Sequence, residues 1–341
     1  MKFALYQPWI YLRGGLERSL LELVTRSRHE WTVYTSHYEP ENTFEGFAKV
    51  RVIELPRVTV NREMFAVLGA AWRIARQKLP LAGMDGLVIW CDGLGDLIAF
   101  RNRGLPIFNI CSTPLRAAFD PVYERQACAR YAWPKRALYA LFKHSFRMAD
   151  RRAWRLFAGV VVTSAEVKRR VLAGGLCVEG PRLRLFYPGI DWQAANGRAS
   201  YEPFLLAPGR IMWTKNLELA VEAFVQAALP APWRLVIAGF VDAKSGGYLE
   251  ALRQSAQRAA RIEFVASPSD AVLADLYARA SAVLFPPLNE DWGIVPLEAM
   301  AHCKPVLANA AGGPLESVRD NLTGWLRPPD AAAWAGVLRE I

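Results

Sequence analysis

The chain has 341 residues, of which 52% are hydrophobic and 22% are charged. That length is long for a single domain, and the composition excludes an intrinsically disordered protein. The net charge of +10 is unevenly placed: residues 1–190 hold 29 Lys and Arg against 16 Asp and Glu, and residues 191–341 hold 13 against 16. This asymmetry predicts that the first half alone meets an anionic surface.

No apolar run approaches the roughly 20 residues that a membrane-spanning helix needs. The five cysteines have no metal-ligand spacing and stand in mostly apolar settings, which indicates reduced thiols. The start of the chain is interrupted by Gln7 and Pro8, so it predicts a buried strand rather than a signal peptide. We therefore expect a cytoplasmic protein, either soluble or peripheral on the inner face of the cell membrane.

Strand-like and helical runs alternate along the first half of the chain. The strands are expected at residues 3–7, 31–35, 50–55, 86–90, 105–110, 159–163 and 183–187. The helices between them are expected at residues 15–28, 62–78 and 164–173. Such alternation predicts βαβ units and a mostly parallel sheet with helices on both faces.

The same pattern restarts after residues 186–191, where Pro188-Gly189 predicts a hinge. Strands are expected at residues 204–208, 234–239, 261–265, 282–286 and 305–309. The helices are expected at residues 215–228, 247–259, 270–280 and 295–302. The predicted fold is therefore α/β with two doubly wound domains, residues 1–190 and 191–341. Ligands of such sheets bind at the carboxyl ends of the strands.

Two glutamates, Glu290 and Glu298, flank the predicted start of a helix in the stretch 288–325. Pro296 suits the first turn of that helix, because its missing N–H has no partner there. Loop amides and the helix dipole form an anion site, while the two carboxylates can accept hydrogen bonds from hydroxyls. A nucleotide sugar carries both phosphates and hydroxyls. The alternative is an acidic residue near a helix start and a glutamate on a solvated face.

This stretch resembles the donor-site signature of the retaining family 4 glycosyltransferases of the GT-B fold. The residues that carry the resemblance are E-x7-E, followed by P-L-E-A-M-A, K-P-V and G-G-x-x-E. Asp291-Trp292 depart from it, because the family usually has Gly-Phe there. The resemblance implies two Rossmann-like domains that face each other across a cleft, with acceptor residues in 1–190 and the nucleotide-sugar donor site in 191–341.

Two cations stand at the predicted carboxyl edge of the second sheet. Arg210 closes a strand and Lys215 is expected to begin the next helix. A forked donor and a point charge together suit a diphosphate, whose charge grows as the glycosyl bond breaks. The spacing is similar to the family's G-R-x-x-x-x-K-N pattern. The alternative is a surface arginine and a lysine at a helix start.

In the first domain, Gly14 and Gly15 lie between the first strand and the first helix. Glycines at that position let backbone amides approach a phosphate or a sugar, although they also serve as simple turn residues. Together with Glu17-Arg18 they resemble the family's G-G-x-E-R, which faces the donor phosphate and the acceptor.

The resemblance assigns a role to each matching residue. Glu298 would accept hydrogen bonds from the ribose hydroxyls, and Glu290 would hold the sugar hydroxyls beside the catalytic cations Arg210 and Lys215. Backbone near the ligand is expected at Trp292, Gly293, Ile294, Val295, Gly312 and Gly313, with Glu316 in support. No Asp-x-Asp motif stands at a strand end, so neither a metal nor a cofactor is implied.

The candidate acceptor residues are Ser112, Arg116 and Asp120. They resemble the H-T-P-x-R-x-x-x-D segment of mannosyl-type members of the family, which favours GDP-mannose over a UDP-sugar donor. Ser112 stands where those members have a histidine. A serine can donate a hydrogen bond but cannot carry charge. We therefore expect this departure to affect the rate of transfer and the geometry in which the acceptor binds.

The basic excess is concentrated in residues 133–157, where aromatic residues interleave with cations at helical spacing. Such a segment suits an anionic membrane surface. The alternative is an amphipathic helix that buries its aromatics, Tyr139, Phe142 and Phe146. No nucleic-acid recognition motif accompanies the charge, so a nucleic-acid partner is not expected.

These residues predict a retaining, metal-independent glycosyltransferase that moves a sugar from a nucleotide diphosphate to a hydroxyl of a glycan or a lipid-linked acceptor. A catalytically silent nucleotide-sugar-binding scaffold of the same fold is the alternative, favoured by Ser112 and by an ending at Ile341 where the family usually continues into a further helix. A GT-B epimerase or phosphorylase is a third option, and we find no pyridoxal-phosphate lysine motif for the phosphorylase.

Overall fold

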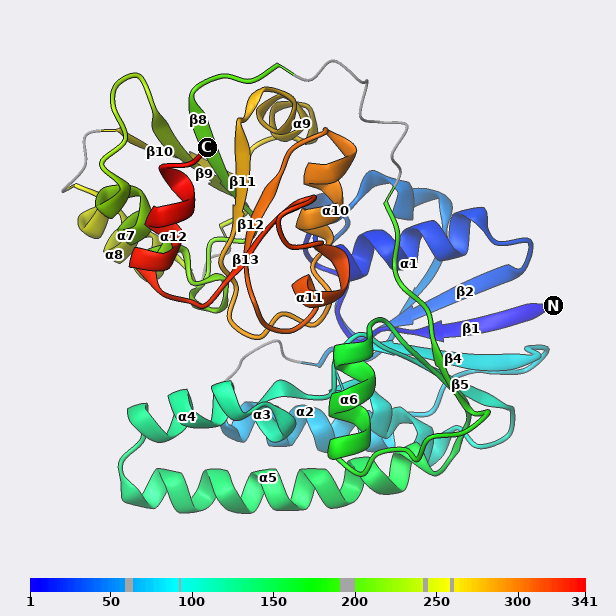
Figure 1. Cartoon of the computed structure of the whole chain (residues 1–341). Helices are drawn as coiled ribbons and strands as arrows, with labels where there is room; N and C mark the ends of the chain where they lie inside the picture. The colour runs from blue at the N-terminus through cyan, green and yellow to red at the C-terminus, as the bar shows by residue number, and fades with distance from the viewer. Residues whose placement is uncertain (59–63, 92, 191–199, 242–244, 258–260) are drawn as a thin grey trace. The chain divides into compact units, whose positions relative to one another are not determined.

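The computed structural model describes residues 1–58, 64–91, 93–190, 200–241, 245–257 and 261–341 (Figure 1). The chain forms two compact units, Met1–Pro188 and Gly189–Ile341. The boundary predicted after residue 190 adjoins residues 191–199, which lie outside the described residues.

Unit 1 contains a seven-stranded sheet in the order β3-β2-β1-β4-β5-β6-β7, and its pairs are parallel. The strands are β1 (Lys2–Tyr6), β2 (Glu30–Thr35), β3 (Arg51–Glu54), β4 (Gly86–Cys91), β5 (Ile107–Cys111), β6 (Phe157–Val162) and β7 (Leu183–Leu185). The direction in which strands are added reverses between β1 and β4. That reversal places a topological switch point at these two strands.

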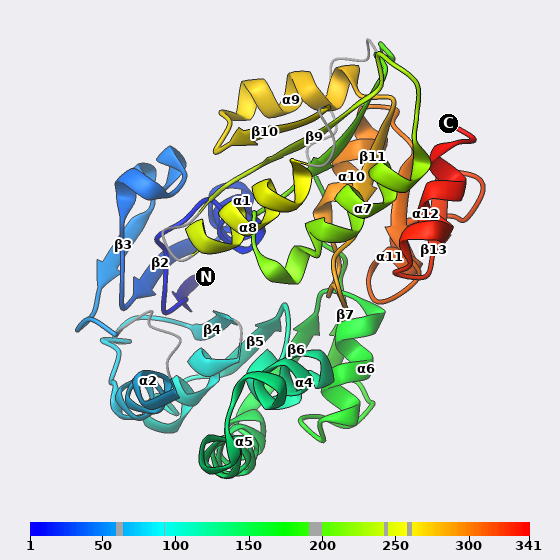
Figure 2. The ribbon, with the colours of Figure 1, turned by 90° about the vertical axis from the view of Figure 1, so that its left-hand side faces the viewer.

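Helices cover both faces of this sheet (Figures 1 and 2). They are α1 (Gly15–Arg26), α2 (Met64–Arg76), η3 (Leu94–Arg101), α3 (Arg116–Phe119), α4 (Pro121–Arg130), α5 (Trp133–Trp154) and α6 (Ala165–Ala173), with two short turns, η1 (Pro40–Asn42) and η2 (Glu45–Lys49). Successive strand residues point to opposite faces. Val88 therefore lies in one core cluster with Leu20 of α1, whereas Ile89 lies in another with Ile74 of α2 and Phe142 of α5.

Unit 2 contains a six-stranded parallel sheet in the order β10-β9-β8-β11-β12-β13. Its strands are β8 (Phe204–Pro208), β9 (Arg234–Gly239), β10 (Ile262–Ala266), β11 (Ala282–Phe285), β12 (Val306–Asn309) and β13 (Gly324–Arg327). Its helices are η5 (Trp213–Lys215), α7 (Leu217–Ala227), α8 (Gly246–Ala256), α9 (Asp270–Arg279), α10 (Ile294–Ala301), α11 (Pro314–Ser317) and α12 (Ala331–Leu338). The buried strands β8 and β11 form its centre.

The predicted strands and helices are present in the predicted order, and the α/β class is confirmed. The first residues of the helix predicted at 62–78 and the last of that at 247–259 lie partly outside the described residues. Several elements were not predicted: η1, η2, η3, α3, α4, α11 and β13. Most of these are short, and η3 is a buried run without an amphipathic period.

All five cysteines are free: Cys91 and Cys111 are buried, whereas Cys303, which follows α10, is exposed. The aromatics Tyr139, Phe142 and Phe146 are buried in the core beside η3, as the amphipathic-helix alternative predicted, so another side of α5 would have to face a membrane. No helix in the described part of the chain is both long and apolar enough to cross a membrane.

Candidate functional site

Two loops meet at the carboxyl edge of the unit 2 sheet. β8 and β11 are neighbours, and β9 and β12 lie on their outer sides, so this is the topological switch point of the sheet. Ligands of doubly wound sheets bind in the crevice at that point. The loop after β8 carries Arg210 and Lys215, and the loop after β11 carries Glu290.

Lys215 and Glu290 form a direct side-chain link between these loops. The Lys215 Nζ lies 2.7 Å from the Glu290 Oε2, and both side chains keep less than a fifth of their surface exposed. The ammonium also lies 5.8 Å from the centre of the Phe285 ring. Partial burial strengthens such a pair relative to one in water. A fixed cation beside a carboxylate is thus held at the edge where a ligand would lie.

The predicted position of Lys215 at a helix start was wrong. Lys215 ends the short turn η5, and α7 begins two residues later at Leu217. Asn216 separates them in the left-handed conformation (φ 48°), which asparagine adopts more easily than most residues. The Asn216 Nδ2 donates to the Pro286 carbonyl at 3.3 Å, so the break in the helix also fixes the loop after β11.

Arg210 follows β8 and is half-buried. Among the described residues it makes no hydrogen bond and no ion pair, unlike Lys215. Its guanidinium therefore keeps its donors available, in the forked geometry that suits phosphate oxygens. The structure brings Lys215 and Glu290 together, and it gives no contact between Arg210 and either of them.

Glu298 lies on α10 and is held by a residue that the sequence analysis missed. The Tyr277 hydroxyl, from α9, donates to the Glu298 Oε2 at 2.8 Å. The Tyr277 ring stacks on the His302 ring at 5.3 Å, and the His302 N–H donates to the Glu298 carbonyl at 3.2 Å. Tyr277 fixes the orientation of the Glu298 carboxylate. No local pattern joins residues 21 positions apart, so only the fold reveals this contact.

Gly293, Gly312 and Gly313 allow the loops around Glu290 to pack closely. A Cβ on Gly313 would lie 2.2 Å from the Trp292 carbonyl oxygen, and one on Gly312 would lie 2.3 Å from that of Glu290. The Gly313 N–H donates to the Glu290 carbonyl at 2.9 Å. Gly293, just before α10, has φ 82° and faces Phe285. These contacts fix the backbone on either side of Glu290.

A second missed residue, Asn309, supports the same loop from β12. Its Nδ2 donates to the Pro286 carbonyl at 2.6 Å and to the Pro287 carbonyl at 3.0 Å. A buried asparagine at the end of an apolar strand is a signal that the sequence analysis could have used. The predicted ligand-facing residues that follow, Trp292, Ile294 and Val295, are all half-buried. Glu316 lies in the short helix α11.

In unit 1, Gly14 and Gly15 lie where β1 leads into α1, as predicted. Gly14 is the N-cap of α1, and a Cβ there would lie 2.5 Å from the Glu17 Oε2. The buried Glu17 carboxylate therefore folds back over the helix N-terminus, where the helix dipole stabilises a negative charge.

Ser112 follows β5, and its hydroxyl is already engaged. The Trp90 Nε1 donates to the Ser112 Oγ at 2.9 Å. The Thr163 hydroxyl, from the end of β6, donates to the Ser112 carbonyl at 3.4 Å. Ser112 therefore joins β4, β5 and β6 at the carboxyl edge of the unit 1 sheet.

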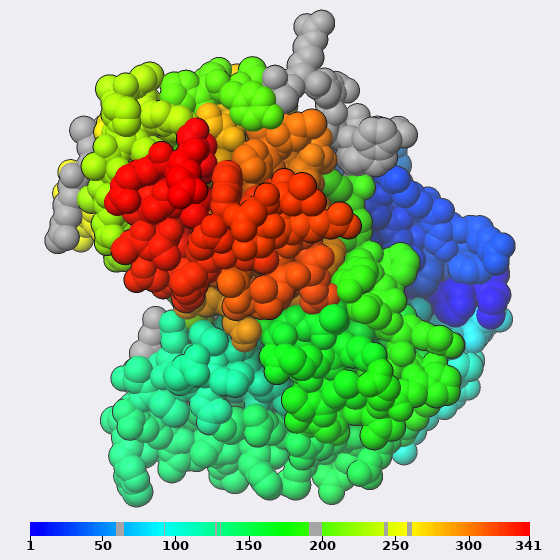
Figure 3. All heavy atoms as spheres, viewed as in Figure 1, coloured from blue at the N-terminus to red at the C-terminus, as the bar shows by residue number. Residues whose placement is uncertain are grey.

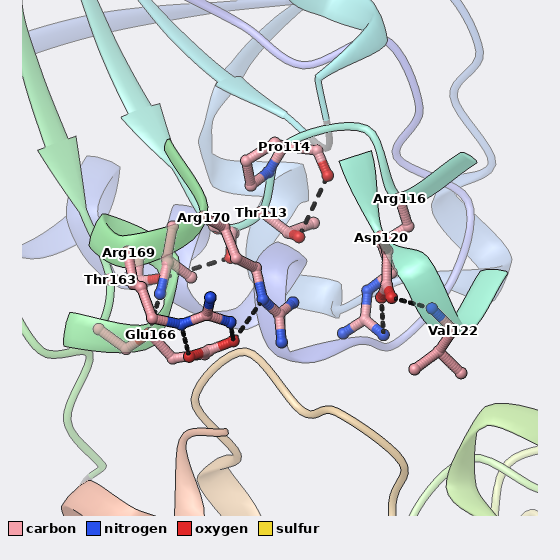
Figure 4. Close-up of polar contacts among 12 residues, drawn as sticks. Thr113, Pro114, Arg116, Asp120, Val122, Thr163, Glu166, Arg169 and Arg170 are labelled. Carbon is pink, nitrogen blue, oxygen red and sulfur yellow. Dashed lines mark hydrogen bonds and ion pairs between the residues drawn. The ribbon is translucent and has the colours of Figure 1, made fainter. Parts of the chain in front are cut away.

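Two arginine–carboxylate groups flank Thr113 at this edge (Figure 4). Arg116 and Asp120 lie 3.6 Å apart, and the Asp120 Oδ1 accepts from the Val122 N–H at the start of α4. On the other side, Glu166 accepts from Arg169 and Arg170 of α6 at 2.7 to 2.8 Å. Burial opposes ionisation of Glu166, but these hydrogen bonds lower its pKa.

Within the described residues, no group of three or more His, Cys, Asp and Glu side chains is placed to hold a metal ion. The residues that could bind a ligand at this edge of unit 2 are the cations Arg210 and Lys215, the acids Glu290 and Glu298, and the backbone of the Gly312–Gly313 loop.

Two doubly wound units with parallel sheets are the architecture of the GT-B class. The model of the family described as glycosyl transferases group 1 matches residues 190–341. An alpha-1,3/1,6-mannosyltransferase ALG2 of Eremothecium gossypii is 44% identical, and the match covers all of this chain and 76% of that protein. The chain therefore belongs to the glycosyl transferases group 1 family.

Other similarities agree with this assignment. The alpha-1,3/1,6-mannosyltransferase alg2 of Schizosaccharomyces pombe is 30% identical over 193 residues, which span 46% of this chain and 38% of that protein. The Anabaena protein HepE, in complex with UDP and glucose, shares the fold with a TM-score of 0.72 at 16% identity, over 100% of this chain and 89% of that one.

Proposed function

We propose that this protein is a retaining glycosyltransferase whose unit 2 binds a nucleotide diphosphate sugar. The observation that carries the proposal is the Lys215–Glu290 pair at the switch point of β8 and β11. A pair of opposite charges at that edge suits a ligand that has an anionic diphosphate and a hydroxylated sugar side by side.

Each residue would act on a different part of the donor. Lys215 and Arg210 would stabilise the diphosphate as the bond to the anomeric carbon breaks and negative charge grows on the leaving oxygen. Glu290 would accept hydrogen bonds from the sugar hydroxyls, and Glu298, oriented by Tyr277, would accept from the ribose. In this proposal the cations neutralise the leaving group, so transfer needs no metal.

Transfer would keep the anomeric configuration. The acceptor oxygen would bond to the anomeric carbon on the face that the diphosphate leaves, and its proton would pass to the departing phosphate oxygen. GDP-mannose is the favoured donor, because Thr113-Pro114 with Arg116 and Asp120 match a mannosyl-type segment and the relatives above are named mannosyltransferases. A UDP-sugar is the alternative donor.

The acceptor would be a hydroxyl of a glycan or of a lipid-linked glycan at an anionic membrane surface on the cytoplasmic side. The support for this location is the charge of unit 1. Five cations of the segment 133–157 are exposed: Lys135, Arg136, Arg151, Arg152 and Arg155. Basic residues near an anionic membrane each add about 1 kcal/mol to binding.

A donor panel tests the proposed reaction. The wild-type protein and the variants Lys215→Ala and Glu298→Ala are incubated with UDP-, GDP- and ADP-sugars, and the released nucleoside diphosphate is measured. We expect one donor to be turned over, and Lys215→Ala to lower kcat by about 10²-fold to 10³-fold. Lys49→Ala and Glu250→Ala, at exposed positions outside the site, are the matched controls.

The outcomes separate the candidate functions. Turnover with an unchanged anomeric configuration of the transferred sugar, read by NMR, supports the enzyme; inversion rules out the retaining mechanism. If wild type binds a nucleotide sugar without turning it over, the silent scaffold is favoured. Ser112 is the reason for this alternative, because it stands where mannosyl-type members have a histidine and its hydroxyl already accepts a hydrogen bond from Trp90. Turnover by Lys215→Ala at the wild-type rate contradicts the assigned leaving-group role.

A further inference from the structure

The helix α2 exposes large apolar side chains on its outer face. Phe65, Leu68 and Trp72 are spaced three and four residues apart, so they share one face, and they are 73%, 37% and 62% exposed. The opposite face packs normally, because Ala70 and Ile74 are buried in the core of unit 1. α2 is thus apolar on both sides, although its outer side has nothing to pack against in the described structure.

α5 repeats this arrangement. Tyr139, Phe142 and Phe146 face the core. On the outer side, spaced eight and seven residues apart, lie Trp133, Leu141 and Met148, which are 80%, 62% and 41% exposed. Scattered exposed apolar residues are common, but apolar residues gathered along one helix face indicate an interaction surface.

The charges on both helices have one sign. Arg73 and Arg76 are exposed on α2, and the Arg76 guanidinium lies 4.9 Å from the centre of the Trp72 ring. On α5 the exposed charged side chains are also cations, and its one acidic residue, Asp150, is fully buried. A surface that combines aromatic residues with an excess of cations is complementary to an anionic lipid surface.

The two helices lie on the same face of the unit 1 sheet. Both pack against η3 and contribute to one core cluster. Figures 1 and 2 show α2 and α5 side by side on that face, and Figure 3 shows atoms of α4 and α5 lying open on the viewed side of unit 1. Their outer faces are therefore available from the same side of the sheet.

We propose that α2 and α5 together form a two-helix docking surface for an anionic lipid bilayer. Trp72 and Phe65 of α2, with Trp133 of α5, would enter the head-group region, where aromatic rings are favoured. The cations of both helices would contact lipid phosphates. The inference builds on the membrane location proposed above and adds α2 as the apolar anchor, which the charge of the sequence does not indicate.

Vesicle binding tests the two helices separately. Full-length wild type is sedimented with phosphatidylcholine vesicles that contain or lack phosphatidylglycerol. Phe65→Ser/Trp72→Ser removes the apolar face of α2, and Lys135→Gln/Arg152→Gln/Arg155→Gln neutralises three cations that make no hydrogen bond or ion pair with described residues. Val178→Ser and Leu322→Ser, at positions 81% and 73% exposed, are the matched controls.

We expect the partition coefficient onto anionic vesicles to fall at least about tenfold for Phe65→Ser/Trp72→Ser and about a hundredfold for the triple neutralisation. The control variants should bind like wild type. Added salt should weaken wild-type binding by screening the cations, and it should leave the difference between wild type and Phe65→Ser/Trp72→Ser in place.

Three results would overturn the proposal in different ways. If wild type fails to bind anionic vesicles, the membrane location itself is wrong, whatever the donor panel shows. If wild type binds and Phe65→Ser/Trp72→Ser binds equally well, α2 is not an anchor. If wild type fails to bind vesicles but forms a dimer that Phe65→Ser/Trp72→Ser abolishes, the surface meets a second copy of the chain and not lipid.

Discussion

Replacing Asp150 by Asn should stabilise the protein, and increasingly so as the pH rises. Asp150 of α5 and Asp96 of η3 are both buried in the core of unit 1. The Trp154 Nε1 donates to the Asp96 Oδ2 at 3.0 Å, and the Asn109 Nδ2 donates to the Asp96 Oδ1 at 2.6 Å. Neither carboxyl oxygen of Asp150 has a hydrogen-bond partner among the described residues.

Burial raises the pKa of Asp96 from its ordinary value of 3.8 to about 7. Burial, and then the charge of Asp96, raises the pKa of Asp150 well above that ordinary value. A buried carboxyl with a raised pKa keeps its proton in the native state, whereas the unfolded chain loses it above about pH 4. Stability is therefore highest at low pH and falls as the pH rises from about 4 through 7.

Each such carboxyl lowers the free energy of unfolding by about 1.4 kcal/mol per pH unit in that window. Wild type has two of them and Asp150→Asn has one. The stabilisation by Asp150→Asn should therefore grow as the pH rises above about 4, by up to about 1.4 kcal/mol per pH unit. An asparagine amide has nearly the same shape as the protonated carboxyl and cannot ionise.

Urea unfolding of the full chain at pH 5, 6 and 7, followed by circular dichroism, measures this difference. Glu41→Gln, at an exposed position of unit 1, changes a carboxyl to an amide without burial, and it should show no growth with pH. A stabilisation by Asp150→Asn that is constant with pH, or one that shrinks, would refute the argument that two buried carboxyls hold their protons.

Two further predictions concern the donor site. Gly313→Ala places a Cβ 2.2 Å from the Trp292 carbonyl oxygen, so the loop must shift. Nucleotide affinity, measured by calorimetry, should then fall at least about tenfold. The control Gly336→Ala, which has open space around its Cβ, should instead raise the unfolding free energy by about 0.5 to 1 kcal/mol. Tyr277→Phe removes a hydrogen bond to the Glu298 carboxylate and should weaken nucleotide binding about threefold to tenfold. An unchanged dissociation constant, measured beside an unchanged melting temperature, would show that Tyr277 does not position Glu298.

The order of strands and helices could be predicted because each buried parallel strand is a short apolar run between turn residues. The same regularity placed Arg210, Lys215 and Glu290 after strands that proved to be neighbours. The side-chain contact between Lys215 and Glu290 followed only from the pairing of β8 with β11, which joins residues 75 positions apart.

Other features had no local signal. Helical spacing put Tyr139, Phe142 and Phe146 on one face of α5, but a period does not say which face meets the core. η3 covers that face of the sheet and was not predicted, because a short buried turn has no amphipathic repeat. The support of Glu298 by Tyr277 likewise depends on α9 packing beside α10.

The most direct test of the central claim is calorimetric titration of UDP, GDP and ADP into wild type and Lys215→Ala, with Lys49→Ala as control. We predict that one nucleoside diphosphate binds wild type and the control equally well, and that Lys215→Ala weakens this binding at least about tenfold. If no nucleoside diphosphate binds wild type at millimolar concentration, or if Lys215→Ala binds it unchanged, the carboxyl edge of β8 and β11 is not the donor site.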